Sequence, residues 1–198
     1  MSLVLRRYGE RAALVEVDSA LEAAALADWA RVAGVEADEI VPAAATVLFD
    51  GVEPSRLAAV LDGWRPGSAT VAGAFVEVPV VFDGPDLADV AARWGVTSQE
   101  VAARLASYEL TSAFCGFAPG FAYLAGLPAE LAVPRLATPR TRVAPGSVAL
   151  AGSWCGIYPT ASPGGWRVVG RTDVVLWDVD REPPALLAPG TRVRLVAR

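Results

Sequence analysis

A chain of 198 residues with 54% hydrophobic residues is long enough to bury a core without disulfides or bound metals. Its net charge of −5 argues against nucleic acid as a partner, and no apolar run approaches the roughly 20 residues that a membrane span requires. The first residues lack the uninterrupted apolar core of a signal peptide, so we expect a cytoplasmic protein.

Residues 1–74 have the pattern of a small N-terminal α+β domain. Ser19 and Glu22 have the spacing of a capping box ahead of a helical stretch that Gly34 ends. A strand-like stretch after this helix is interrupted at Pro42. The expected order is strand, strand, helix, strand and helix, over residues 3–8, 12–17, 20–33, 39–49 and 53–64. This order predicts a split α/β sandwich.

Residues 75–198 have a different pattern, which follows a linker-like Arg-Pro-Gly-Ser at 65–68. We expect a strand at 75–82 and two short helices at 86–94 and 97–106, the second opened by a capping box of Thr97 and Glu100. Beyond Glu109, prolines and glycines separate short apolar runs that we expect to be strands, at 147–150, 168–169, 174–177 and 192–196. Many short strands with dense turn signals predict a barrel or a curled sandwich.

The types of residue that are missing restrict the chemistry of the chain. It has no His, Lys or Asn, and all 17 basic residues are arginine. Ser–His–Asp and Cys–His mechanisms, a Schiff-base lysine and a Walker lysine are therefore excluded on this chain. Arginine stays protonated, so it can hold an anion but is a poor proton shuttle. The two cysteines, Cys115 and Cys155, are expected to be reduced, and without histidine they do not indicate a metal site.

The stretch from 107 to 172 carries the functional signal. Five arginines against two carboxylates give it a net charge of +3 within an acidic chain. Gly116 and Gly120 stand among aromatic residues, and such glycines permit a close backbone approach that leaves amides free to face a ligand. The alternative is a tight loop packed under its own rings. Arg135 and Arg140 each follow a proline, which restricts the backbone beside them and would favour binding of an anion by their guanidinium groups. The alternative is that both are surface arginines in turns.

Several pieces of this stretch together resemble a known family. They are GFAPGFAYLAGLP at 116–128, APGSVALAG at 144–152, GIYP at 156–159 and SPGGWRVVGRT at 162–172. The chain resembles the family of the 5-oxoprolinase B subunit, also known as allophanate hydrolase subunit 1 or the sporulation-kinase inhibitor, which corresponds to subdomains C and D of a carboxyltransferase domain. The resemblance implies an N-terminal α+β domain, at 1–74, followed by a cyclophilin-like β-barrel domain, at 75–198.

The resemblance also implies partners and a reaction. The expected partners are a homologous second subunit (the C subunit of 5-oxoprolinase, or allophanate hydrolase subunit 2) and a third one (the A subunit of 5-oxoprolinase). The complex would use ATP, which we do not place on this chain, to open the lactam of 5-oxoproline to glutamate or to hydrolyse a related amide. A small carboxylate is therefore the expected substrate.

The candidate substrate-binding residues follow from this expectation, and no catalytic residue is assigned. Arginines would line an anion pocket, hydroxyls would supply polar contacts, and amides around Gly116–Gly120 and Gly146–Ser147 would stabilise an oxyanion. The set is Arg135, Arg140, Arg171, Ser147, Tyr158, Gly116 and Gly120. Cys155 is expected to be a small core residue, since no histidine is available to activate it.

The sequence departs from the family at a position that bears on activity. Relatives usually carry a histidine about a dozen residues before the first Gly-Phe, and Leu105 falls near that position. Two other functions therefore stay open. One is a regulatory binding module that inhibits a sensor histidine kinase, and the other is a structural subunit that holds its partner's catalytic half.

Overall fold

The computed structural model describes residues 3–65 and 73–198, and its contacts fall into two compact units, 1–72 and 73–198. Each unit is described by itself. The linker predicted at 65–68 lies, beyond Arg65, outside the described residues. None of the helices in the described ranges is long and apolar enough to cross a membrane.

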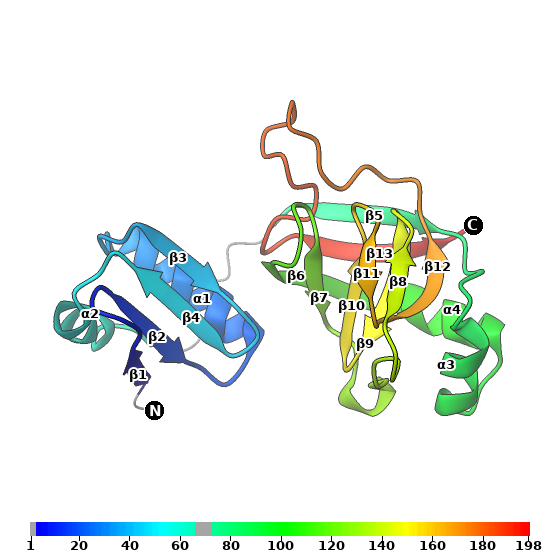
Figure 1. The fold of residues 1–198 in the computed structure, drawn as a ribbon, viewed down its shortest axis with the longest axis horizontal. Helices are drawn as coiled ribbons and strands as arrows, with labels where there is room; N and C mark the ends of the chain where they lie inside the picture. Colours follow the sequence, from blue (N-terminus) through cyan, green and yellow to red (C-terminus); the bar gives the residue numbers. More distant parts are fainter. Residues whose placement is uncertain (1–2, 66–72) are drawn as a thin grey trace. The chain divides into compact units, whose positions relative to one another are not determined.

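The first unit is an antiparallel sheet of four strands with two helices (Figure 1). Its strand order is β1-β2-β4-β3, and its core includes Leu26 of the first helix and Phe49 of the sheet, both fully buried. The elements are β1 (Val4–Arg7), β2 (Ala12–Glu16), α1 (Ala20–Val32), β3 (Glu39–Pro42), β4 (Thr46–Asp50) and α2 (Pro54–Leu61). The single strand expected at 39–49 is in fact a hairpin, because the chain turns after Pro42 and Ala43 N–H donates to the Thr46 carbonyl (2.8 Å).

Capping explains where the helices of this unit begin. Ser19 accepts a hydrogen bond from Glu22 N–H (3.2 Å), and the Glu22 carboxylate accepts from Asp18 N–H (2.8 Å). At α2, Glu53 accepts from the backbone N–H groups of Ser55 and Arg56, so its charge lies at the positive end of the helix.

The second unit is a curled, half-barrel sheet of seven strands, with a separate two-stranded ribbon and two helices (Figure 1). The sheet order is β12-β9-β10-β7-β6-β13-β5, and every neighbouring pair is antiparallel except β13 with β5. Its helices are α3 (Leu87–Trp94) and α4 (Ser98–Ser107), with the short 3-10 helix η1 (Ala129–Leu131). Its strands are β5 (Phe75–Val80), β6 (Glu109–Cys115), β7 (Ala122–Ala125), β8 (Arg140–Val143), β9 (Ser147–Ala151), β10 (Trp154–Ile157), β11 (Ser162–Gly164), β12 (Arg167–Arg171) and β13 (Arg192–Ala197).

Two apolar clusters hold the second unit together. The larger one joins α3 and α4 to the sheet and includes Val80, Leu105 and Leu195, all fully buried. The smaller one is rich in aromatic residues and lies around Phe121, Tyr158 and Trp166. The ribbon β8–β11 contributes Val143 to this second cluster, so the ribbon is packed on aromatic side chains.

The strand predicted at 174–177 does not form, and this prediction was wrong. The segment belongs to a long loop that stands out from the sheet between β12 and β13 (Figure 1), with one isolated bridge from Trp177 to Ala185. The Arg181 guanidinium donates to the carbonyl groups of Val175, Leu176 and Pro184. A side chain, rather than a neighbouring strand, thus satisfies much of this backbone.

Candidate functional site

The glycine-rich turn between β6 and β7 is held in an unusual conformation. Phe117 has a φ of 71° and is the only non-glycine residue in the described ranges with a positive φ; its side chain is 61% exposed. Left-handed backbone at a bulky residue costs free energy and is concentrated at functional sites. Gly120 is also left-handed, and a Cβ there would lie 2.8 Å from the Trp177 Cβ. The turn therefore needs a glycine to approach the long loop.

An aromatic cluster packs beneath this turn. Phe121 lies at its centre, with ring-centroid distances of 5.3 Å to Tyr158, 5.4 Å to Trp166 and 5.2 Å to Tyr123, all edge-to-face. The exposed Phe117 ring packs against Phe121 and Tyr158. Such rings give the site a rigid apolar base.

Tyr158 is buried under the ribbon β8–β11. A Cβ at Gly164 would lie 2.3 Å from the Tyr158 hydroxyl oxygen, so only glycine permits this contact. The phenol oxygen accepts a hydrogen bond from the Trp166 backbone N–H. Burial raises the pKa of Tyr158, although the Trp166 hydrogen bond and the charges of Arg135 and Arg140 act in the opposite direction.

The ribbon presents two buried donors that have no partner. Gly164 pairs with Arg140 and Ser162 with Val143, with an irregular register between the two pairs, and Gly164 is the position that lies against the Tyr158 hydroxyl. Within the described residues, Arg140 Nη1 and Ser162 Oγ are buried and make no hydrogen bond. Buried polar groups are normally satisfied, so these two atoms are candidates for hydrogen bonds to acceptor oxygens of water or of a ligand.

Asp86 orients Arg140. Its Oδ1 accepts from Arg140 Nη2 (2.8 Å) and its Oδ2 accepts from Val168 N–H (2.7 Å), while the residue is only 7% exposed. The hydrogen bond to Asp86 raises the pKa of Arg140. Nη1 of the same guanidinium makes no hydrogen bond to the described residues.

Asp86 is the middle of three acidic residues that each pair with an arginine. Asp83 binds Arg171 (2.9 Å), and Asp89 binds Arg167. None of these acids was among the site residues predicted from the sequence. The three aspartates follow one another at intervals of three residues, and this spacing was the one sequence signal that could have pointed to them. Only the fold shows that the segment from Val81 to Asp89 runs along β12, next to the arginines.

The structure does not bring all the predicted site residues together. Arg135 is exposed, has no side-chain partner among the described residues, and lies close enough to Tyr158 to affect its pKa. Arg171 instead binds Asp83 and lines a separate small pocket of about 170 Å³ with Val81 and Arg198. The structure therefore groups Arg135, Arg140 and Tyr158 and separates Arg171 from them.

Several of the amides expected to stabilise an oxyanion are engaged within the fold, but the N–H groups of Phe117 and Gly120 make no hydrogen bond among the described residues. Gly116 N–H donates to the Phe121 carbonyl (3.2 Å), and Gly146 N–H donates to the Tyr158 carbonyl (2.7 Å). Ser147 is buried, its N–H donates to the Ala144 carbonyl (3.3 Å), and its own carbonyl accepts from Tyr158 N–H (3.0 Å). Gly116, Gly146 and Ser147 therefore position Tyr158 and the turn through their backbone hydrogen bonds.

Leu105 and Cys155 belong to the core rather than to this site. Leu105 is fully buried in α4 within the larger apolar cluster. Cys155 is fully buried in β10, which confirms the expectation of a core residue, and burial raises its pKa to about 12. No group of three or more acidic or thiol side chains in the described ranges could hold a metal ion.

Comparison with known proteins gives the same family as the motifs. The chain is 47% identical over 125 residues to the B subunit of 5-oxoprolinase from Escherichia coli O157:H7 and 41% identical over 127 residues to that of Haemophilus influenzae. These matches cover 62% and 63% of this chain and 57% and 60% of the relatives, so the chain matches less than two thirds of their length.

Solved structures extend the likeness to nearly the whole chain. TTHA0988 is 33% identical with a TM-score of 0.78, over 95% of this chain and 40% of that one. The Kluyveromyces lactis urea amidolyase shares the fold, with 19% identity and a TM-score of 0.75 over 99% of this chain and 15% of that one.

The pattern of the carboxyltransferase domain, subdomain C and D, matches residues 3–187, and the chain therefore belongs to that family.

Proposed function

We propose that this chain is a cytoplasmic subunit of a heteromeric, ATP-dependent amidohydrolase whose substrate is 5-oxoproline or a related small amide carboxylate. The observation that carries the proposal is the buried, unpartnered Nη1 of Arg140, held in place by Asp86 and accompanied by Ser162 Oγ. A guanidinium binds a carboxylate through parallel charge-assisted hydrogen bonds. The relatives named as B subunits of 5-oxoprolinase support this choice of substrate class.

The residues of this chain would bind and orient the substrate. Arg140 and Arg135 would hold the carboxylate, and the exposed Phe117 ring, which packs on the buried Phe121, would support the apolar face of a small ring. Hydrolysis adds water across the amide C–N bond and yields a carboxylate and an amine. Holding the carboxylate fixes the amide carbonyl relative to groups that the partner subunits would supply.

We expect ATP to bind to the partner subunits rather than to this chain. The site offers two arginines and the hydroxyls of Ser162 and Tyr158, enough for a single anionic group but too few for a triphosphate with its magnesium ions. Bound ATP would supply the driving force for opening a resonance-stabilised amide. The expected partners are two further subunits, one of them homologous to this chain.

The test is reconstitution of the complex with those two subunits, followed by an assay of ATP-dependent conversion of 5-oxoproline to glutamate. Arg140→Ala should lower kcat/KM by about 10-fold or more, because a hydrogen bond to a charged group is worth about 1.5–3 kcal/mol. Arg135→Ala should raise KM. Arg142→Ala is the matched control, since Arg142 is exposed on the same strand β8. Full activity of both the Arg135 and Arg140 variants would show that the carboxylate binds elsewhere.

A second candidate function is a regulatory module that binds a sensor histidine kinase. The long loop after β12 favours it, because Val175, Trp177 and Val179 are exposed at 62%, 38% and 78%. Exposed apolar side chains that gather on one loop are typical of a protein contact. Kinase binding that a Val179→Asp change abolishes, in a complex that turns over no amide, would favour this function over the enzyme.

We also propose that residues 75–198 form a cyclophilin-like β-barrel domain and residues 1–74 an N-terminal α+β domain. The curled sheet and its separate aromatic cluster support the first assignment. Expression of 75–198 alone should give a cooperative thermal unfolding transition. A chain without such a transition would contradict an independent domain.

A further inference from the structure

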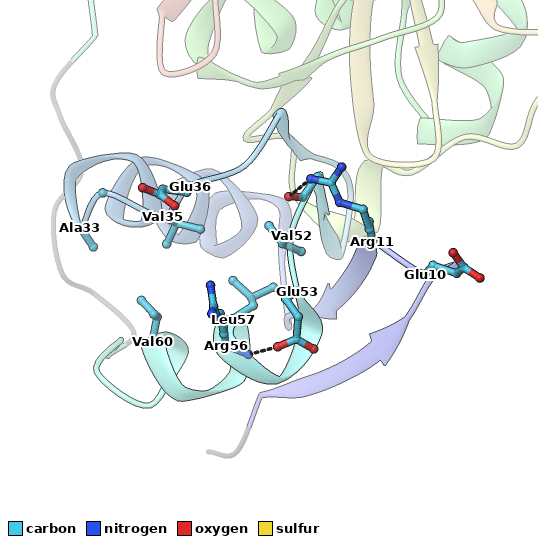
Figure 2. A pocket seen from close by; sticks show the side chains of 12 residues that line it. Glu10, Arg11, Ala33, Val35, Glu36, Val52, Glu53, Arg56, Leu57 and Val60 are labelled. Carbon is cyan, nitrogen blue, oxygen red and sulfur yellow. Dashed lines mark hydrogen bonds between the residues drawn. The ribbon is translucent and has the colours of Figure 1, made fainter.

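A pocket lies in the first unit and is lined by residues of that unit alone. It has a volume of about 630 Å³ and is formed by the end of α1, the connection from β4 to α2, and one side of α2 (Figure 2). This volume is within the range of small-molecule sites.

The floor of this pocket is apolar. Val52 and Leu57 are buried, at 4% and 3% exposure, and belong to the core of the unit. Val35 and Val60 extend the apolar surface towards solvent, and Val60 is 42% exposed. A branched aliphatic group could cover these side chains and remove them from water.

Two charged residues at the pocket are already engaged. Arg11 Nη2 donates to the Gly51 carbonyl (3.0 Å), which ties the turn between β1 and β2 to the loop before α2. The Glu53 carboxylate accepts from the first backbone N–H groups of α2, and hydrogen bonds to Ser55 and Arg56 lower its pKa. Both residues build the wall of the pocket rather than offer a binding group.

Three other charged residues line the pocket and have no side-chain partner among the described residues: Glu10, Glu36 and Arg56. Glu10 lies in the turn between β1 and β2. Figure 2 shows that Arg56 comes from α2 and Glu36 from the segment after α1, so the two charges belong to different walls. A cation and an anion that stand apart over an apolar floor match a ligand with both charges and an apolar group.

We propose that this pocket binds a free α-amino acid with a branched aliphatic side chain. The carboxylate would pair with Arg56, the ammonium group with Glu36, and the side chain would lie on Val52, Leu57 and Val60. The surplus of acidic residues, three against two arginines, disfavours phosphate-bearing ligands. This site is independent of the proposed carboxylate site in the second unit and would allow an amino acid to act as an effector of the protein.

The experiment is isothermal titration calorimetry of the full chain with each of the 20 standard L-amino acids. We expect leucine, isoleucine or valine to bind most tightly. Arg56→Ala and Glu36→Gln should each weaken that binding by at least 10-fold, because each removes one charge partner. Both side chains are exposed, so the variants should keep the wild-type circular dichroism spectrum.

The controls separate this site from general charge effects. Glu39→Gln changes an exposed glutamate on β3, and Arg142→Ala an exposed arginine on β8, and neither lines the pocket. Both should bind as the wild type does. Equal binding of leucine and 4-methylpentanoate, which lacks the ammonium group, would overturn the proposal. So would the absence of any amino acid binding, or binding that neither pocket variant weakens.

Discussion

Replacing Asp86 by alanine should destabilise the second unit far more than replacing Asp83, although each aspartate pairs with one arginine. Asp86 is 7% exposed and accepts two hydrogen bonds, from Arg140 Nη2 (2.8 Å) and from Val168 N–H (2.7 Å). Asp83 binds only Arg171 (2.9 Å), and those side chains are 47% and 57% exposed. The chain thus contains a buried ion pair and an exposed one of similar length.

The expected magnitudes follow from burial. Removing one partner of a buried pair costs about 3–5 kcal/mol. Because the Arg140 side chain remains 30% exposed, water can recover part of this loss, and we expect about 3 kcal/mol for Asp86→Ala. Asp86→Asn should cost roughly half as much, since the amide oxygen can still accept one hydrogen bond. Asp83→Ala should cost less than about 1 kcal/mol.

The assay is urea denaturation of the full chain, followed by circular dichroism, for the single variants and for Asp86→Ala combined with Arg140→Ala. The double variant should be less destabilised than the sum of the two single variants, because each single change leaves a buried group unpaired. If Asp86→Ala and Asp83→Ala cost the same, or if the two changes at Asp86 and Arg140 are additive, the buried pair does not hold Arg140 as described.

Three further predictions concern the aromatic cluster and the thiols. Gly164→Ala should lower the free energy of unfolding in urea by about 1–3 kcal/mol, because the new Cβ would lie 2.3 Å from the Tyr158 hydroxyl oxygen. Gly165→Ala is the control and should cost little, since the nearest atom to its Cβ would be 3.6 Å away. Equal costs of the two changes would refute the contact. Burial raises the pKa of Tyr158, so the unfolded chain loses this proton first and stability should fall as the pH rises above about 10, less steeply in Tyr158→Phe. At pH 8 iodoacetamide should leave Cys155 unmodified in the folded protein, because the thiol is buried and its pKa is raised to about 12. In urea the reagent should modify both Cys155 and Cys115. Rapid labelling of Cys155 in the folded protein, detected by mass spectrometry, would contradict its burial.

Local signals in the sequence predicted the helices well. The capping box of Thr97 and Glu100 forms as expected, with Glu100 accepting from Thr97 N–H (2.7 Å) and Thr97 accepting from Glu100 N–H (3.2 Å). Strands were harder to predict, since their pairing depends on distant partners. The apolar run at 174–177 has the composition of a strand, yet Arg181 satisfies much of its backbone instead.

The sequence by itself determined the family, the helices and the exclusion of histidine and lysine chemistry, because these depend on residue identity and on contacts between near neighbours. It also placed the motifs shared with the family between residues 116 and 172. Only the tertiary structure decided which arginines share a site. Arg140 and Arg171 lie in the same arginine-rich stretch, but each is directed by a different aspartate, Asp86 or Asp83, from a segment more than 50 residues away. An ion pair depends on where side chains meet in space, and that is set by the packing of the 81–89 segment along β12.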